Sequence, residues 1–161
     1  MTPYKTPVSV LVVIHTPAAE VLLIERTDSP GFWQSVTGSC ESGDSDLVET
    51  ARREVFEETG IQAAAERFVD WHLSNIYEIY PAWRWRYAPE VTHNTEHLLS
   101  LCVAAGTVVQ LSPREHTAWQ WLEAKAAAER CYSPSNAEAV LQLPRFLAQG
   151  VSRLHASRGE K

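Results

Sequence analysis

Three glutamates on one face of a predicted helix constrain this chain more than any other feature. Residues 47–59 contain helix formers and apolar residues at helical spacing, and Gly60 stands where a helix commonly ends. Glu54, Glu57 and Glu58 occupy positions i, i+3 and i+4, so their carboxylates share one helical face, which we expect to be turned towards solvent. Each like-charged pair at this spacing is unfavourable by roughly 0.2–0.5 kcal/mol. The pattern therefore predicts that a cation lies against this face.

Oxygen ligands of this kind suit Mg²⁺ or Mn²⁺, which bind carboxylates together with waters and phosphate oxygens. An isolated pair of glutamates on a helix usually marks only a solvated surface. This pair belongs to a longer string, residues 53–61, of the form Arg-Glu-aliphatic-x-Glu-Glu-x-Gly-aliphatic. From average residue usage, such a string occurs by chance in on the order of one in 10⁵ sequences. A metal site is therefore the better interpretation, with Val55 anchoring the helix to a sheet.

The size and charge of the chain limit the remaining possibilities. A chain of 161 residues with ordinary apolar content buries one core, so we expect a single domain over residues 1–150 and a frayed tail over residues 151–161. The formal net charge of −6 argues against nucleic acid as a partner, because phosphate contacts over a broad surface need a surplus of Lys and Arg. An acidic protein still binds phosphate when a metal ion supplies the positive charge.

Neither the cysteines nor the apolar segments indicate an oxidising compartment or a membrane. Cys40, Cys102 and Cys131 are an odd number without metal-ligand or redox spacing, which favours the reducing cytoplasm. The longest apolar stretch, Val8 to Ile14, is far too short to span a bilayer, and no leader pattern precedes it. Nothing in the sequence indicates an oligomeric state.

The order of predicted elements indicates an α+β fold in which helices cover a mixed sheet. Period-2 patterns, β-branched residues and turn signals predict seven strands, at residues 8–14, 21–26, 32–38, 67–80, 83–88, 96–105 and 119–122. Helices are predicted at residues 47–59, 124–129 and 135–147, with Ser133 or Ser135 as a cap for the last of them.

The glutamate string and the glycine before it resemble the signature of the Nudix hydrolase family. That signature reads G-x5-E-x7-R-E-U-x-E-E-x-G-U, where U is a bulky aliphatic residue. Gly38 matches its first glycine, and the second half is matched by Arg53, Glu54, Val55, Glu57, Glu58, Gly60 and Ile61. The first acidic position falls on Asp44, but eight residues instead of seven then precede Arg53. One residue is therefore inserted among Asp44, Ser45 and Asp46.

The resemblance implies a Nudix fold, which is an α/β/α sandwich around a mixed central sheet, and hydrolysis of a phosphoanhydride bond. It further implies that the helical glutamates hold Mg²⁺, with Mn²⁺ as a substitute, and that Arg53 orients them by charge-assisted hydrogen bonds. A carboxylate from outside the helix often completes such sites as a metal ligand or base. Glu115, in the loop before the last strand, is our candidate, and the alternative is an ordinary acidic residue of a loop.

Segments outside the signature resemble the bacterial dihydroneopterin triphosphate diphosphatase branch of this family. They are YK-x-PVSVLVVI from Tyr4, FWQSVTGS from Phe32, RYAP-x-VT-x-NTE from Arg86, and WL-x-A followed by S-x-SN ending at Asn136. This resemblance implies an enzyme of folate biosynthesis that converts 7,8-dihydroneopterin 3'-triphosphate to the monophosphate and pyrophosphate. The expected partner is thus a small-molecule triphosphate.

Such a substrate needs cations for its phosphates and both stacking faces and a carboxylate for its ring. Lys5 and Arg26 are candidate phosphate ligands, although both are equally well explained as solvated surface charges. Thr37 could offer its hydroxyl or backbone. Residues 77–80 combine aromatic rings with a carboxylate and are expected to line the base pocket, or else form an edge strand with packed tyrosines; they are Tyr77, Glu78, Ile79 and Tyr80. Ser133 is a further hydrogen-bond donor or only a helix cap.

Three other functions compete with this hypothesis. A Nudix pyrophosphohydrolase acting on dATP or oxidised nucleotides shares the glutamate helix and differs only in the base pocket. A non-catalytic Nudix-fold binding module usually lacks the glutamates, which this chain keeps. The alternation of aromatic residues and arginines from Trp83 to Tyr87 also resembles a platform for single-stranded nucleic acid, but one such strand in an acidic protein gives little support.

Overall fold

The sheet is built around β1 (Val8–His15), which pairs with three other strands. In the computed structural model, which describes residues 4–147, seven strands form one sheet in the order β3-β2-β1-β6-β5, with β4 paired to β1 and β7 to β2. Only the β1–β6 pair is parallel among the pairs of described strands, so the sheet is mixed. The tail predicted at residues 151–161 lies outside the described residues, and a single domain over residues 1–150 stays a prediction.

Alternate residues of β1 contact opposite layers of the molecule. Val10, Val12 and Ile14 belong to a core cluster that includes Ala51 and Val55 of α1 (Leu47–Thr59). The intervening residues of β1, Leu11 and Val13, belong to a second cluster with buried residues of α2 (Ala124–Arg130) and α3 (Pro134–Gln142). Because both faces of β1 are buried, its central residues, Val10 to Ile14, form an unbroken apolar run.

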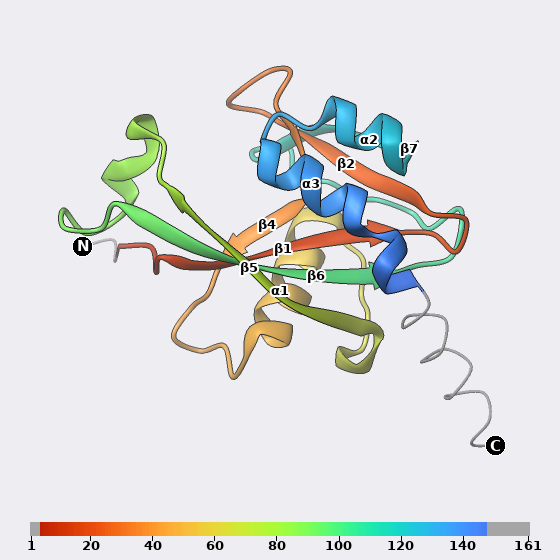
Figure 1. The fold of residues 1–161 in the computed structure, drawn as a ribbon, viewed down its shortest axis with the longest axis horizontal. Helices are drawn as coiled ribbons and strands as arrows, with labels where there is room; N and C mark the ends of the chain where they lie inside the picture. Colours follow the sequence, from red (N-terminus) through yellow and green to blue (C-terminus); the bar gives the residue numbers. More distant parts are fainter. Residues whose placement is uncertain (1–3, 148–161) are drawn as a thin grey trace.

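Helix α1 therefore covers one face of the sheet, and α2 and α3 cover the other (Figure 1). This arrangement confirms the α+β class and the α/β/α sandwich with a mixed central sheet. No helix in residues 4–147 is both long enough and apolar enough to cross a membrane.

Helix α1 has the predicted bounds, and its sequence explains both of its ends. The side chain of Asp46 caps the first turn by accepting a hydrogen bond from the backbone N–H of Glu49. At the other end Gly60 has a φ of 73°, a left-handed conformation that costs glycine nothing, and its N–H donates to the carbonyl of Phe56.

The other elements agree with the predictions in type, with ends that differ by a few residues. β2 is Glu20–Arg26, β5 is Phe68–Glu78, β6 is His93–Cys102 and β7 is His116–Glu123, and a short 3₁₀ helix, η1 (Ala65–Arg67), precedes β5. Helix α3 ends at Gln142, because Pro144 has no N–H with which to continue the hydrogen-bond ladder. Residues 144–147 are helical again.

The prediction of a strand at residues 83–88 is wrong. Residues Pro81–Arg86 form a 3₁₀ helix, η2, in which Pro81 supplies the fixed φ that suits a first turn. The backbone N–H of Trp83 donates to the carbonyl of Tyr80, and that of Tyr87 donates to Arg84. The alternation of aromatic residues and arginines therefore reflects a turn with aromatic packing, and it removes the stacking strand on which the nucleic-acid hypothesis depended.

The strand predicted at residues 32–38 is divided into β3 (Trp33–Gln34) and β4 (Val36–Ser39). The division occurs at Ser35, which is fully buried and bonds to α3 instead of a neighbouring strand. Its N–H donates to Asn136 Oδ1 at 2.8 Å, and Asn136 Nδ2 donates to Ser35 Oγ at 3.0 Å. This pair of bonds lets β3 join β2 while β4 joins β1.

We expect Asn136→Ala to lower the free energy of unfolding by about 1–3 kcal/mol, because it leaves the buried N–H of Ser35 without a partner. Glu138→Ala, an exposed position on the same helix, is the control and should change stability by less than about 0.5 kcal/mol. Urea denaturation measures both, and equal stabilities of the two variants would contradict the proposed role of Asn136.

Candidate active site

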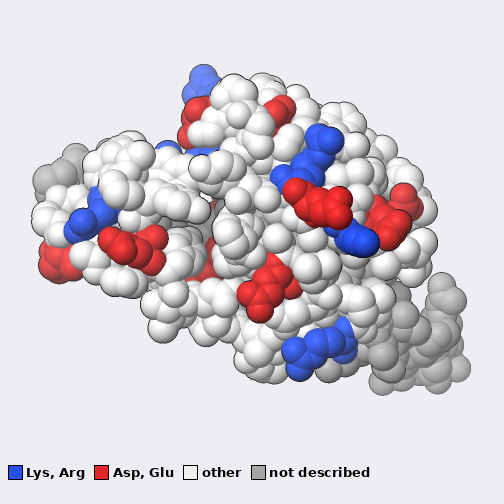
Figure 2. Space-filling model, turned by 45° about the horizontal axis from the view of Figure 1, so that its top comes forward, with Lys and Arg blue, Asp and Glu red and all other residues white. Residues whose placement is uncertain are grey.

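A cleft of about 1130 Å³ opens where β1, β4 and β6 meet α1, η2 and the loop before β7. Figure 2 shows a hollow on this side of the molecule, with acidic atoms visible inside it. The cleft-lining residues include three carboxylates of α1, several cations and a group of aromatic side chains, and they come from both ends of the sequence. The fold thus gathers the separate candidate segments around one space.

The three glutamates of α1 all line this cleft, but they differ in burial. The Glu57 side chain is 52% exposed, whereas those of Glu54 and Glu58 are 14% and 5% exposed. The expectation that the whole row faces solvent is therefore wrong, because Glu58 is buried at the cleft against His116 of β7.

Gly38 of β4 makes room for the carboxyl group of Glu54. A Cβ added at Gly38 would overlap the carboxyl carbon and the Cγ atom of Glu54. The glycine of the signature is thus explained by a close approach between strand and helix, since any larger residue there would displace the carboxylate.

Arg53 holds the carboxylates from behind and does not itself line the cleft. Its Nη1 donates to Glu54 Oε1 at 2.8 Å and to Glu57 Oε2 at 3.4 Å. Its Nη2 donates to the carbonyl of Ser39 and to Asp44 Oδ2, both at 3.0 Å. One guanidinium therefore ties two of the acidic side chains to β4 and to the loop before α1.

The loop that contains the inserted residue before α1 has two aspartates, Asp44 and Asp46, with different roles. Asp44 accepts hydrogen bonds from Arg53, from Thr50 Oγ1 and from the backbone N–H of Glu41. The hydrogen bond from Arg53 is the main reason that the pKa of Asp44 is lowered to about 2. Asp46 caps the helix. Asp44 therefore supports Arg53, and it is not among the residues that line the cleft.

Glu115 and His116 add ligand atoms from a different element. One atom from each of Glu58, Glu115 and His116 lies within 4.8 Å of the others. His116 was not singled out from the sequence, and its only signal there was its position beside Glu115. Burial is the main cause that lowers the pKa of His116 to about 4, so its ring is neutral and does not offset the charge of Glu58.

Among the described residues, Arg53 offsets part of the charge of Glu54 and Glu57, but Glu58 forms no ion pair with a lysine or arginine. Burial raises the pKa of Glu54 to about 7 and that of Glu58 well above its usual range, and neighbouring carboxylates add to the effect on Glu58. Glu58 Oε2 is buried and has no hydrogen-bond partner among the described residues. Carboxylate oxygens in this arrangement fit a divalent cation such as Mg²⁺ or Mn²⁺.

Most of the predicted substrate ligands lie around the same cleft. Its lining includes Lys5, Arg26, Thr37, Tyr77, Glu78, Tyr80 and Ser133. Ile79 is only 2% exposed and is not part of the lining. Ser133 also caps α3 by accepting a hydrogen bond from the N–H of Asn136, so the two interpretations of this residue are compatible.

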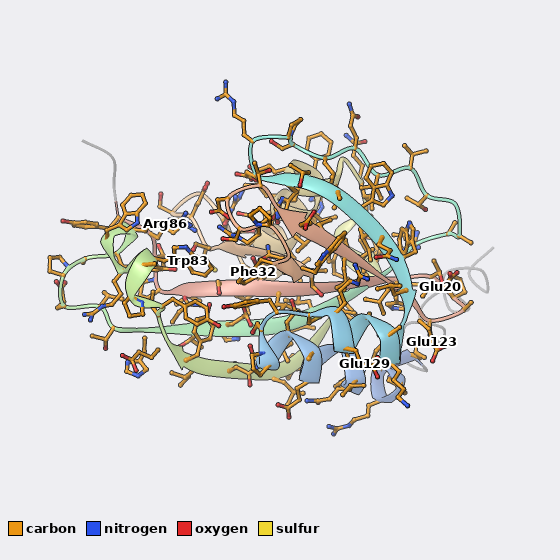
Figure 3. The ribbon with its side chains drawn as sticks, turned by 90° about the horizontal axis from the view of Figure 1, so that it is seen from above. Glu20, Phe32, Trp83, Arg86, Glu123 and Glu129 are labelled. Atoms are coloured by element: carbon orange, nitrogen blue, oxygen red, sulfur yellow. The ribbon has the colours of Figure 1, made fainter. Side chains whose placement is uncertain are left out.

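Several cations and aromatic residues at the cleft were not predicted as ligands. Arg86 and Arg114 line it, and so do Phe32 and Trp83, whose ring centroids are 5.9 Å apart. Figure 3 shows Arg86 and Trp83 on η2 with Phe32 beside them. The Arg26 guanidinium lies 4.7 Å from the centroid of the Trp83 ring, so the aromatic group also positions a cation.

Comparison with known proteins identifies the family. The sequence model described as NUDIX domain matches residues 5–143, which is most of the chain. The chain belongs to the Nudix family. Its glutamate helix, signature glycine and supporting arginine are therefore the Nudix signature in its folded form, with one residue inserted before the helix.

Two curated relatives of this chain, from different bacteria, have the same name. The chain is 44% identical over 142 residues to dihydroneopterin triphosphate diphosphatase of Escherichia coli K12, covering 86% of this chain and 93% of that protein. It is 41% identical over 143 residues to the protein of the same name from Haemophilus influenzae, covering 87% and 89%. The structure of the E. coli dihydroneopterin triphosphate pyrophosphohydrolase matches with a TM-score of 0.79 and 42% identity, covering 88% of this chain and 97% of that one.

We expect Gly38→Ala to lower turnover by about 100-fold with little loss of secondary structure, because the added methyl group displaces the Glu54 carboxylate. Gly43→Ala is the matched control, since a Cβ there meets no atom within 4 Å. Steady-state kinetics and circular dichroism of both variants test this, and normal activity of Gly38→Ala would show that the close approach is unimportant.

The raised pKa of Glu54 predicts how metal-free stability varies with pH. The folded protein holds this proton more tightly than the unfolded chain, so the wild type should lose stability relative to Glu54→Gln as pH rises from about 4.5 to about 7. The expected relative change is up to about 3 kcal/mol, at 1.36 kcal/mol per pKa unit. Buried histidines have the opposite trend in both proteins and cancel in the comparison. Denaturation of chelator-treated protein across this range measures the difference, and parallel curves would contradict the prediction.

Proposed function

We propose that this Nudix hydrolase is a dihydroneopterin triphosphate diphosphatase that uses Mg²⁺, or Mn²⁺ in its place. It would convert 7,8-dihydroneopterin 3'-triphosphate to the monophosphate and pyrophosphate, a step of folate biosynthesis, in the cytoplasm. The observation that carries the proposal is the 44% identity to an enzyme of this name over nearly the full length of both chains. The cleft adds support, because it combines an acidic end, several cations and an aromatic group in one space.

Glu54, Glu57, Glu58 and Glu115 are the proposed metal ligands. A divalent ion held there supplies positive charge to the phosphate oxygens and lowers the pKa of water in its coordination shell. Arg53 fixes the directions of Glu54 and Glu57 through its hydrogen bonds, so these ligands are already in place before substrate arrives. Glu115 comes from another element, and we propose it as a ligand or as the group that accepts a proton from the attacking water.

The cations at the cleft are the proposed ligands of the triphosphate. Lys5 and Arg26 offset negative charge on the phosphate chain, as Arg86 does. Burial, followed by the charge of Arg86, lowers the pKa of Lys5, and the negative charge of an arriving polyphosphate would offset these effects by pairing with the ammonium group. Arg26 is held by two hydrogen bonds to Asp28, at 2.8 and 2.7 Å, and by its position over Trp83. Its guanidinium is therefore oriented in advance.

The competing functions differ in their requirements. A Nudix enzyme acting on dATP or oxidised nucleotides has the same acidic end and another base specificity. A non-catalytic binding module needs no metal ion. The presence of all three signature glutamates, Glu54, Glu57 and Glu58, argues against such a module. The net charge of −6, and the mixture of acidic and basic groups on the face in Figure 2, favour a small substrate over nucleic acid.

The free state of Cys40, Cys102 and Cys131 supports a reducing compartment.

Identification of the products is the direct test of the proposed substrate. With Mg²⁺ we expect dihydroneopterin triphosphate to yield the monophosphate and pyrophosphate in equal amounts, at a higher kcat/KM than dATP or 8-oxo-dGTP. Chromatography of the reaction mixtures with Mg²⁺ and with a chelator measures this. A clear preference for dATP or 8-oxo-dGTP would show that the proposed substrate is wrong. If none of the three compounds released pyrophosphate, the result would favour the non-catalytic binding module.

Glu57→Gln and Glu58→Gln are expected to lower turnover by about 100-fold or more while the fold is kept, because each removes charge from the metal site. Glu58→Gln should also raise the metal-free melting temperature, since it removes a buried carboxyl group whose Oε2 has no hydrogen-bond partner among the described residues and whose ionisation burial opposes. Glu49→Gln is the control on the same helix, where Glu49 forms only an exposed ion pair with Arg52. Full activity in either site variant would refute the assignment.

A further inference from the structure

A second buried carboxylate, apart from the acidic end, lines the same cleft. Glu96 of β6 is 5% exposed, and it forms no hydrogen bond or ion pair through its side chain with the residues that the structure describes. Burial raises its pKa to about 7. A carboxylate with no partner that is shielded from water but open to a cleft is a strong acceptor for a ligand with N–H donors.

Asn94, two residues earlier on the same strand, places another unused acceptor beside it. Residues two apart on a strand share a face, and Asn94 and Glu96 both line the cleft. Both protons of the Asn94 amide are used, because Nδ2 donates to Ser9 Oγ at 2.8 Å and to Tyr77 Oη at 3.0 Å. Its Oδ1 is buried and has no partner among residues 4–147. The pair therefore forms a wall of acceptors without matching donors.

This wall is separate from the metal ligands. The carboxylates whose charges raise the pKa of Glu58 are Glu54, Glu115 and Glu57. The charge of Glu96 instead raises the pKa values of Tyr77 and Tyr87, after the larger effect of burial on each. Glu96 thus belongs with the tyrosines, at a part of the cleft suited to a ring and not to phosphates.

We infer that Glu96, assisted by Asn94, recognises the ring of the substrate by accepting hydrogen bonds from the two adjacent N–H donors of a 2-amino-4-oxo pyrimidine unit. A dihydropterin carries that unit, with a ring N–H next to an exocyclic amino group, and a carboxylate matches it with two parallel hydrogen bonds. Adenine has no such pair of donors on adjacent positions. The inference deepens the proposed function and rests on it.

Glu78 is the competing carboxylate, and its exposure makes it the weaker choice. It lines the cleft at the end of β5 but remains exposed to water. Water competes for hydrogen bonds at an exposed carboxylate, so the net gain on binding a ring there is smaller than at a buried one. Glu96 ends the segment RYAP-x-VT-x-NTE, but the sequence assigned it no role, because its burial in the cleft depends on contacts between distant segments.

The test separates ring recognition from phosphate binding. Calorimetry would measure binding of 7,8-dihydroneopterin, which lacks phosphates, and of pyrophosphate with Mg²⁺, which lacks a ring. Glu96→Gln is expected to weaken dihydroneopterin binding by about 10- to 100-fold, as for loss of a hydrogen bond to a charged group, and to leave pyrophosphate binding unchanged. Glu66→Gln, an exposed residue outside the cleft, is the control and should match the wild type in both measurements.

A change in the ligand gives a second measurement that does not depend on a variant. A dihydropteridine whose 2-amino group is replaced by oxygen should bind the wild type about 10- to 100-fold more weakly than dihydroneopterin. If the wild type hydrolyses dihydroneopterin triphosphate but Glu96→Gln binds dihydroneopterin normally, or Glu78→Gln alone loses it, the inference is wrong and the proposed function stands. If the wild type does not hydrolyse that triphosphate at all, the proposed function fails and the inference fails with it.

Discussion

The burial of neighbouring carboxylates, which opposes their ionisation, is the constraint on which the rest of this structure depends. Glu54 and Glu58 lie largely out of water, and their pKa values are raised because burial opposes their ionisation. Arg53 offsets part of the charge of Glu54 and Glu57, but Glu58 receives no such contact. The fold thus builds a strongly acidic end that is balanced only when a cation occupies it. An anionic substrate then becomes a favourable ligand of an acidic protein.

The sandwich places this acidic end in the same cleft as the proposed site for a ring. β1 is the shared element, since it pairs with β4, which carries the glycine under Glu54, and with β6, which carries Asn94 and Glu96. Ser9 of β1 stands opposite Ser39 on one side and Glu96 on the other. A single strand therefore fixes the spacing between the two ends of the cleft. A substrate with phosphates at one end and a ring at the other fits this arrangement.

The parts that could be predicted from the sequence depend on local patterns. The bounds of α1 and its terminal glycine follow from spacing and residue type, and the signature identified Gly38 and Arg53. The burial of Glu58 could not be predicted, because it depends on the contact with His116, which is distant in the sequence. Trp83 to Tyr87 alternate as a strand does, yet tertiary packing and Pro81 make them a 3₁₀ helix. The roles of His116 and Glu96 depend on contacts between distant segments, which leave no periodic signal.

The central claim is that a divalent ion balances the carboxylates of α1 and Glu115. Crystals soaked with Mn²⁺ and pyrophosphate test it most directly, since manganese is located by its anomalous scattering. The account predicts an anomalous peak in contact with oxygens of these glutamates and of pyrophosphate. Bound pyrophosphate with no peak at these side chains, or a peak held elsewhere in the molecule, would contradict it.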